Sequence, residues 1–338
     1  MILARRRARW VGAAAFFLIV LSAVGCTPVV VPAGPPVVAP QLESDAVLLD
    51  DGVRLPLRHW QPEHGMPRAV VLALHGFNDY SVAFDLPATY WAEHGVMTYA
   101  YDQRGFGDSP THGFWSSPEA LVRDSNTIAR LLRARHPNLP LYLLGESMGG
   151  AVLLASSNQH LPDVDGLILV APAVRSRETM GTLYRTALWL GAHVIPWAEL
   201  TGKGLNIVAT DNIEVLRAMQ RDPLIIKSTR IDAIWGLVDL MDRAMVAAPE
   251  LKDRPTLVVY GTRDEVVPTG PVETFVERLP DNTAIAVYDH GYHMLLRDLG
   301  SRAVLDDILA WIARPGVPLA SRADLAGAAL FDRIDDGP

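Results

Sequence analysis

A serine between two glycines is the residue whose surroundings point most directly to chemistry. Ser147 lies in the segment Gly145-Glu-Ser-Met-Gly149, directly after the apolar run Leu141–Leu144 and before residues with helical character. A sharp turn from strand to helix needs small residues on both sides of the serine, whose hydroxyl is then held exposed. The helix that begins there points free N–H groups at developing negative charge. We predict that Ser147 is a nucleophile and that the Met148 N–H donates to an oxyanion; the alternative is a serine in a glycine-rich turn.

A second oxyanion donor should come from the loop that follows the apolar run Ala69–Leu74. His75, Gly76 and Phe77 stand there, and a glycine lets another segment of backbone approach closely. We predict that the Phe77 N–H is this second donor. His75 comes too early in the chain to serve as the base, so we expect it to orient the loop by hydrogen bonding.

The acid that supports the base should follow the nucleophile at the end of a later strand. Asp264 meets this requirement, because it follows the apolar run Thr256–Tyr260 and a glycine turn. Glu265 is its neighbour, but the following pair Val266-Val267 indicates that only one of the two carboxylates points inward. We therefore predict Asp264 as the acid; the alternative is an acidic turn without a chemical role.

The base should come last, after the final strand, where His290 and His293 offer two imidazoles. His293 lies in a glycine-containing turn just before an apolar helix start, from which an imidazole can reach the site. His290 still lies at the end of the strand and is expected to be structural. The order Ser147, Asp264, His293 is that of the α/β-hydrolases and differs from the orders in chymotrypsin and subtilisin.

These residues need a scaffold, and the chain alternates short apolar runs with longer amphipathic stretches. Such alternation predicts an α/β fold with a mostly parallel central sheet flanked by helices. Strands are expected at Val53–Trp60, Ala69–Leu74, Val96–Tyr101, Leu141–Leu144, Gly166–Val170, Thr256–Tyr260 and Ala284–Tyr288, with helices at Pro118–Arg135 and Met148–Gln159. In open α/β sheets, ligands bind at the carboxyl ends of the strands, where the residues named above lie.

A stretch of helical character without a convincing strand pair interrupts this alternation. We predict a core in two parts, residues 45–172 and 253–312, with residues 173–252 as a helical cap over the carboxyl edge of the sheet. The alternative is a second domain that does not contribute to the site. Residues 313–338 form a C-terminal tail, either mobile or docked as a short helix near 324–332.

The first residues resemble an export signal. Four arginines precede a 14-residue apolar stretch, which is shorter than a membrane-crossing helix, and residues 1–25 are predicted to be a signal peptide. Cys26, the one cysteine of the chain, ends a segment that resembles a bacterial lipobox, so we predict that Cys26 is lipidated. Residues 26–44 then form an anchor and a proline-rich tether that holds the domain off a membrane. An ordinary cleaved signal peptide and an uncleaved anchor are the alternatives.

These features place the protein in the bacterial cell envelope as a membrane-anchored lipoprotein, on the periplasmic or outer-membrane face. The formal net charge is −8 and the body has no basic run, so nucleic acid is not an expected partner. No cluster has metal-ligand spacing, and the expected chemistry needs no metal or organic cofactor. The oligomeric state does not follow from the sequence.

The segments HGFNDYS, YDQRGFGDS, GESMGGA, GTRDEVVP and GYHMLLRD together resemble the monoacylglycerol lipase and lysophospholipase branch of the α/β-hydrolases, a branch also grouped with serine aminopeptidases. The resemblance covers about residues 45–312. It implies Ser147 as nucleophile, Asp264 as acid, His293 as base, and Phe77 with Met148 as oxyanion donors. It also implies that Asp102, Arg104 and Gly105 shape a loop and do not catalyse.

The expected activity is therefore hydrolysis of a carboxylic ester through an acyl-enzyme, with a lipid or other small ester as substrate. Related lipases often carry small residues after the His-Gly pair, so Phe77 is expected to narrow the acyl pocket. A small-ester carboxylesterase, a thioesterase or a perhydrolase with the same three residues remains open, and outside enzymes so does a non-catalytic envelope binding module. An apolar funnel for an acyl chain would be lined by Met180, Leu183, Tyr184, Leu188, Trp189, Leu190, Ile195 and Trp197.

Overall fold

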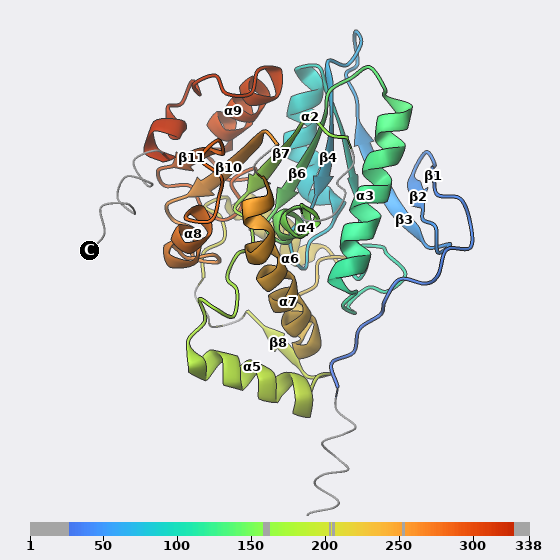
Figure 1. Ribbon diagram of the computed structural model, residues 1–338, viewed down its shortest axis with the longest axis vertical. Coiled ribbons are helices and arrows are strands. Elements are labelled where there is room, and N and C mark those ends of the chain that lie inside the picture. The colour runs from blue at the N-terminus through green and yellow to red at the C-terminus, as the bar shows by residue number, and fades with distance from the viewer. Residues whose placement is uncertain (1–26, 158–162, 203, 205–206, 252–253, 328–338) are drawn as a thin grey trace, which may run out of the picture.

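A computed structural model describes residues 27–157, 163–202, 204, 207–251 and 254–327. A twisted sheet crosses the middle of this part of the molecule, with helices on both of its faces (Figure 1). Its strands follow the spatial order β1-β2-β3-β5-β4-β6-β7-β10-β11. They are β1 (Gln41–Leu42), β2 (Ala46–Leu48), β3 (Arg54–Trp60), β4 (Ala69–Leu74), β5 (Val96–Tyr101), β6 (Leu141–Glu146), β7 (Gly166–Val170), β10 (Thr256–Gly261) and β11 (Ala284–Tyr288).

The six strands from β5 to β11 in this order run parallel, and only β1, β2 and β3 add to the sheet in antiparallel fashion. Strand β4 is buried along its whole length, and so are β5, β6, β7 and β10. Continuous burial explains why these strands are apolar runs without alternation, because helices cover both faces of a parallel sheet. The prediction of a mostly parallel sheet flanked by helices is confirmed.

The helices divide between the two faces of the sheet. The buried side chains of α2 and α9 share one apolar core, and those of α3, α4, α7 and α8 share the other. The bounds are η1 (Ser81–Phe84), α2 (Asp85–Glu93), α3 (Pro118–Arg135), α4 (Met148–Ser156), α5 (Thr182–Val194), α6 (Ile213–Arg221), α7 (Ile231–Ala247), η2 (Ala248–Leu251), α8 (Thr269–Val276) and α9 (Ser301–Ala313). Helix α4 was expected to reach Gln159, which lies outside the described residues.

The insertion after β7 differs in two ways from the predicted cap. It contains a short antiparallel pair, β8 (Glu199–Thr201) with β9 (Ser228–Arg230), where no strand pair was expected. Three-residue polar strands are too short for a sequence pattern to reveal them. Its last helix, α7, packs against α4, and the Ser157 hydroxyl donates to the Ala247 carbonyl at 2.9 Å. Helix α7 therefore covers the sheet, whereas α5 and β8, which pairs with β9, project beyond it at the bottom of Figure 1.

The proline-rich segment 27–40 lies along the domain and does not stand away from it as a spacer. Its backbone pairs with the body at several points: the Val31 N–H donates to the Trp115 carbonyl at 2.9 Å, and the Gly34 N–H donates to Asp51 at 3.0 Å. The Val29 N–H donates to Asp232, in the first turn of α7, at 3.3 Å. Prolines lack an N–H group, but the residues between them still have donors that the domain can bind. We call this segment the strap.

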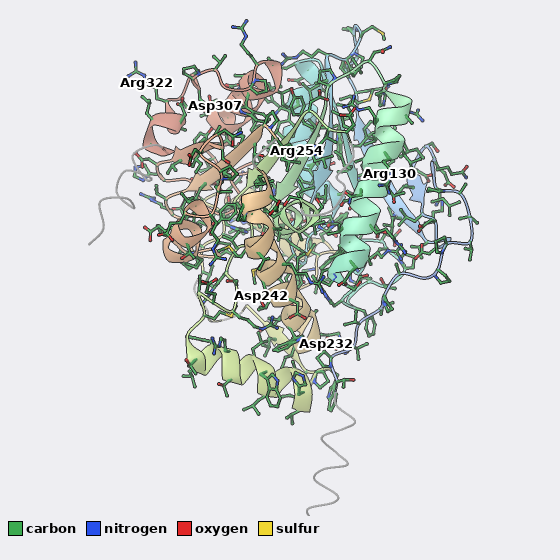
Figure 2. The ribbon with its side chains drawn as sticks, in the orientation of Figure 1. Arg130, Asp232, Asp242, Arg254, Asp307 and Arg322 are labelled. Carbon is green, nitrogen blue, oxygen red and sulfur yellow. The ribbon has the colours of Figure 1, made fainter. Side chains whose placement is uncertain are left out.

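The C-terminal tail is docked on the body as far as residue 327, and residues 328–338 lie outside the described part. Leu319 and Ala323 are buried, and the Ser321 hydroxyl donates to Asp307 of α9. Asp307 and Arg322 of the tail are labelled close to each other in Figure 2. Residues 323–327 are helical, so a helix begins within one residue of the start expected near 324. A Cβ at Gly327 would lie 2.1 Å from the Ile285 carbonyl oxygen, so only glycine allows this close approach to β11.

The loop after β5 is fixed by its own charged residues. Arg104 binds Asp51 at 2.8 Å and Asp124 at 2.5 Å, and all three side chains are buried. Asp102 accepts hydrogen bonds from the backbone of Ser81 and Asp108. These contacts tie the loop to the strap's partner Asp51 and to helix α3, in keeping with a role in shape rather than chemistry.

Candidate active site

Ser147 occupies the tight turn between β6 and α4 with a strained backbone. Its φ of 52° and ψ of −114° lie outside the regions that most residues adopt. The flanking glycines make the turn possible: a Cβ at Gly145 would lie 2.4 Å from the Gly149 carbonyl carbon, and a Cβ at Gly149 would lie 2.1 Å from the Leu74 carbonyl oxygen. Strain of this kind persists where the surrounding structure holds it, as it does at many functional sites.

The three side chains predicted for acyl transfer meet in one hydrogen-bonded chain. His293 Nε2 lies 3.0 Å from Ser147 Oγ, and His293 Nδ1 lies 2.7 Å from Asp264 Oδ2. Because the carboxylate can only accept, Nδ1 carries the proton, and Nε2 is left as an acceptor for the serine hydroxyl. The side chains come from the ends of β6, β10 and β11, and each is largely buried.

Asp264 and its neighbour Glu265 point to different partners. Asp264 Oδ1 accepts from the N–H groups of Val266 and Val267, at 2.8 and 2.9 Å, while Oδ2 accepts from His293. Glu265 instead accepts from the Val208 N–H at 2.8 Å, in the segment between β8 and α6. The structure thus places Asp264 at the imidazole and Glu265 against the insertion.

The two amides predicted as oxyanion donors come from loops that touch. A Cβ at Gly76 would lie 3.3 Å from Ser147 Cβ and 3.9 Å from Ser147 Oγ, so the His75–Phe77 loop runs directly beside the serine. Within the described residues, neither the Phe77 N–H nor the Met148 N–H donates a hydrogen bond to another protein group. Two free amides beside a nucleophile can bind an oxygen that gains negative charge.

His75 and His290 do not join the chain of Ser147 and His293. His75 is fully buried, its Nδ1 lies 2.8 Å from the Gly76 carbonyl oxygen, and its Nε2 accepts from the Gln103 N–H at 3.0 Å. Burial lowers the pKa of His75, so the neutral ring orients this loop. His290 has a φ of 67° and its N–H donates to Thr262, which makes it a turn residue on the surface.

Three buried charged residues next to the site were not predicted from the sequence. Arg297 binds Asp79 at 2.8 Å and Glu146 at 3.1 Å, and each of the three side chains is less than a tenth exposed. The signal in the sequence is Glu146 itself, a carboxylate between a buried strand and the serine, which demands a partner. The partner lies 151 residues away, so no local pattern identifies it.

Most of the side chains expected to line an apolar funnel are exposed on the surface of the insertion. Met180 and Leu188 pack partly against the core. The remaining residues of the expected lining are exposed: Leu183, Tyr184, Trp189, Leu190, Ile195 and Trp197. A separate apolar hollow of about 190 Å³ lies between α6 and the segment 79–86, and Asp79 and Arg297 are among the residues that line it.

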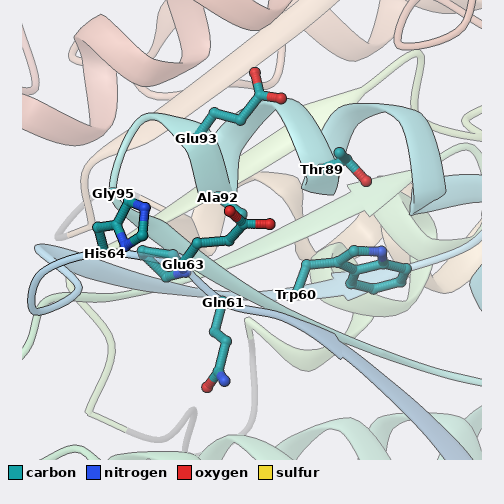
Figure 3. A pocket seen from close by; sticks show the side chains of 9 residues that line it. Trp60, Gln61, Glu63, His64, Thr89, Ala92, Glu93 and Gly95 are labelled. Carbon is teal, nitrogen blue, oxygen red and sulfur yellow. The ribbon is translucent and has the colours of Figure 1, made fainter.

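A second hollow, of about 480 Å³, is lined by the end of β3, the loop that follows it and helix α2 (Figure 3). Trp60, Glu63, His64 and Glu93 are among its lining residues, and it lies where β5 begins. Ligands of α/β proteins bind at the opposite, carboxyl edge of the sheet. Over the described residues, no cluster of three or more His, Cys, Asp or Glu could hold a metal ion, and no helix there is long and apolar enough to cross a bilayer.

Together, the mostly parallel sheet, the strained serine turn and the order of serine, aspartate and histidine define an α/β-hydrolase. The chain belongs to the serine aminopeptidase S33 family of hydrolases, whose pattern matches residues 65–300. This match includes Phe77, Ser147, Asp264 and His293.

Known proteins of similar sequence and structure agree with this family. The chain is 26% identical to a monoacylglycerol lipase of Mycolicibacterium smegmatis over 263 residues, which covers 77% of this chain and 93% of the relative. It is 26% identical to a monoglyceride lipase of Rattus norvegicus over 270 residues, or 78% and 88% of the two chains. A soluble variant of the monoglyceride lipase of Saccharomyces cerevisiae has a similar fold, with a TM-score of 0.67 at 18% identity, over 84% and 96% of the two chains.

Proposed function

We propose that this protein hydrolyses monoacylglycerols and related carboxylic esters through an acyl-enzyme on Ser147. The observation that carries the proposal is the hydrogen-bonded chain from Asp264 through His293 to Ser147, beside two free backbone amides. Such an arrangement performs acyl transfer without a cofactor. Two relatives named as monoacylglycerol and monoglyceride lipases support the choice of ester.

The reaction proceeds in two halves. His293 Nε2 takes the proton from Ser147 Oγ as this oxygen attacks the ester carbonyl, and Asp264 stabilises the resulting imidazolium. The Phe77 and Met148 N–H groups hold the carbonyl oxygen while it carries negative charge. The proton then passes from His293 to the alcohol as the C–O bond breaks. Water repeats the sequence on the acyl-enzyme and releases the acid.

The length of the acyl chain decides between the proposed lipase and a small-ester carboxylesterase. Phe77 packs its ring against Phe106 and Trp115, with centroids 5.6 and 6.1 Å apart, and its amide is one of the proposed oxyanion donors. Because its amide is a proposed oxyanion donor, Phe77 is the residue whose side chain we expect to limit the acyl group that fits. Thioesterase and perhydrolase chemistry would use the same three residues, and a non-catalytic binding module would use none of them.

A series of p-nitrophenyl esters from acetate to palmitate, together with monooleoylglycerol, tests the substrate. Each methylene of the acyl chain that becomes buried stabilises the complex by about 0.8 kcal/mol, so for a lipase we expect kcat/KM to peak at chains of roughly eight or more carbons. We also expect monooleoylglycerol to be cleaved. Phe77→Ala should move the peak toward longer chains, because the ring no longer restricts the pocket. A peak at acetate or butyrate would favour the small-ester enzyme, and no turnover of any ester would leave the binding module.

We also propose that Cys26 carries a lipid and that the protein is held at a bacterial membrane, on the periplasmic or outer-membrane face. Residues 1–26 lie outside the described part, so the support comes from where the chain enters it. The strap brings Val29 to Asp232, which is labelled in Figure 2. A Cβ added at Gly191 of α5 would lie 3.2 Å from Cγ2 of the neighbouring Ile231, so α5 is close to this point.

This point of entry coincides with exposed apolar side chains of the insertion. Leu183, Tyr184 and Trp189 on α5 are 79%, 68% and 51% exposed, and Trp197 follows at 57%. Such a patch on a soluble surface marks a site of contact. An anchor attached next to it would hold α5 against the bilayer, so the lipid supply and the insertion would lie on the same side of the molecule.

Binding of protein beginning at Thr27 to phosphatidylglycerol–phosphatidylethanolamine vesicles tests this orientation. Leu183→Glu should weaken co-sedimentation by roughly tenfold, because burying a leucine contributes about 1.5–3 kcal/mol and a carboxylate opposes insertion. Hydrolysis of soluble p-nitrophenyl acetate should be unchanged. Met66→Glu is the matched control, since Met66 is 88% exposed in the loop before β4, at the opposite edge of the sheet. Equal effects of the two substitutions would contradict the orientation.

A further inference from the structure

A buried arginine lies between two carboxylates at the back of the candidate site. Arg297 donates from Nη1 to Asp79 at 2.8 Å and from Nη2 to Glu146 at 3.1 Å. Arg297, Asp79 and Glu146 are 7%, 4% and 2% exposed, so water does not screen these charges. The buried neighbouring carboxylates hold the pKa of Arg297 above its usual value, and burial raises that of Glu146.

Each member of this network belongs to a different part of the proposed machinery. Glu146 is bonded directly to Ser147, and Arg297 lies four residues after His293 in a turn where its N–H donates to the Met294 carbonyl at 2.7 Å. Asp79 closes the turn that contains Phe77, because its N–H donates to the Gly76 carbonyl at 3.3 Å. One guanidinium therefore joins the nucleophile, base and oxyanion loops.

Stability alone does not account for this arrangement. Replacing a buried ion network with apolar residues is often neutral or stabilising, because moving each charge out of water costs on the order of several kcal/mol. Among the described residues, Glu146 Oε1 and Arg297 Nε have no hydrogen-bond partner, so the network is not fully satisfied. What it does supply is a fixed distance between three loops that the sequence separates by 67 and 151 positions.

We propose that Arg297 is a positioning residue that holds the Phe77 amide, Ser147 and His293 in register by binding Asp79 and Glu146 at once. This inference rests on the proposed function, because it assigns a role within the same reaction. Arginine suits the task since its planar fork reaches two carboxylates in fixed directions, whereas lysine is a point charge on a flexible stem. A displacement of about 1 Å in such a site can cost roughly 10²-fold in rate.

The network also sets the charge that His293 experiences. The charged groups around the imidazole are Asp264 from the turn after β10, Glu146 from the end of β6, Asp79 from the oxyanion loop, and Arg297 and Asp298 from its own loop. Glu146 interacts electrostatically with both His293 and Arg297, so the three groups share one buried charge cluster. Removing the cation leaves the net charge of this cluster more negative, and the pH dependence of a reaction that uses His293 as its base should respond.

The test compares Arg297→Met, Arg297→Lys and Glu146→Gln by two readouts. One is kcat and KM for a p-nitrophenyl ester, measured per active site after titration. The other is the pH dependence of the rate at which a fluorophosphonate labels Ser147, which needs the base and oxyanion donors but no particular ester. Thermal midpoints are recorded for each variant. Arg302→Met is the matched control, because Arg302 also pairs with an aspartate but is 69% exposed on α9.

With Arg297→Met we expect kcat to fall about 100-fold and KM to change less than about threefold, since ground-state binding is spared. The acidic limb of labelling should move to higher pH, and Glu146→Gln should move it to lower pH. Arg297→Lys should restore the limb, because the charge remains, but not kcat, because one ammonium cannot span both carboxylates. Arg302→Met should match the unchanged protein in every measurement.

A purely structural role has a different signature and would overturn the proposal. In that case the variants would lower the thermal midpoint, while kcat per titrated site and the acidic limb stayed at their original values. Recovery of full kcat by Arg297→Lys would also overturn it, since charge alone would then suffice. If the unchanged protein cleaved no ester, the proposed function would fail, yet fluorophosphonate labelling of Ser147 would still decide whether Arg297 positions these loops.

Discussion

Replacing Ser147 with alanine should lower kcat for ester hydrolysis by about 10⁶-fold, the largest effect we expect from any single substitution. The Ser147 hydroxyl oxygen forms the acyl-enzyme, and it lies 3.0 Å from His293 Nε2 in the unchanged protein. Without this hydroxyl, His293 has no nucleophile to deprotonate. Removing the serine of a hydrogen-bonded triad costs nearly as much as removing all three residues, because they act as a unit. What persists is the contribution of the Phe77 and Met148 amides and of substrate binding.

Release of p-nitrophenol in a stopped assay measures this loss, with binding of the ester checked separately. Ser157→Ala is the control, because Ser157 follows α4 by one residue and its hydroxyl bonds to the Leu154 and Ala247 carbonyls, away from the site. The activity of Ser157→Ala should stay within about twofold of that of the unchanged protein, because this substitution removes one hydroxyl away from the site. Retention of a hundredth or more of the activity by Ser147→Ala would remove Ser147 from the reaction.

Replacing Asp264 with asparagine should lower kcat by about 10⁴-fold with little change in structure. Asparagine can keep the Oδ1 acceptor for the Val266 and Val267 N–H groups, so the turn after β10 is preserved. Its amide NH₂ takes the place of Oδ2 and donates to His293 Nδ1. The imidazole then carries its proton on Nε2, where it faces Ser147 Oγ as a donor and cannot accept the hydroxyl proton.

Glu265→Gln is the matched control for this substitution, because it removes the neighbouring carboxylate and leaves the triad intact. Its side-chain amide oxygen can still accept from the Val208 N–H, so we expect activity within about threefold of the unchanged protein. Burst kinetics with p-nitrophenyl acetate compare the two variants directly, since acylation depends on the histidine tautomer. Equal losses in both variants, or a greater loss in Glu265→Gln, would show that Asp264 is not the acid.

Residues next to each other in the chain carried most of what could be predicted about this protein. The turn at Ser147 follows from Gly145 and Gly149, whose missing Cβ atoms let the backbone approach Leu74 and close the strand–turn–helix. The buried strands follow from unbroken apolar runs such as Ala69–Leu74, which only a sheet covered on both faces can accommodate. Each predicted active-site residue lies at a strand end, so the parallel sheet brings these residues to one edge.

Local patterns were also enough to choose between neighbours where burial differs sharply. Asp264 was preferred to Glu265 because apolar residues follow, and the structure places Asp264 at 5% exposure against His293. The choice of His293 over His290 rested on a glycine-containing turn and an expected helix start directly after it. Residues 293–297 form turns instead, and the next helix, α9, begins at Ser301. In both cases the sequence indicates which side chain points inward, because the short turn after a buried strand leaves the backbone few conformations.

Only the tertiary structure decided which distant groups meet. The strap was expected to be a spacer, yet its free N–H groups find acceptors at Trp115 and Asp232. The pairing of Arg297 with Asp79 and Glu146 joins positions 218 and 151 residues apart. Periodicity and turn chemistry report the conformation of adjacent residues, whereas the partner of a buried charge depends on how remote segments pack. The sequence by itself therefore determined the fold class and the candidate triad, and three-dimensional packing determined what holds that triad in place.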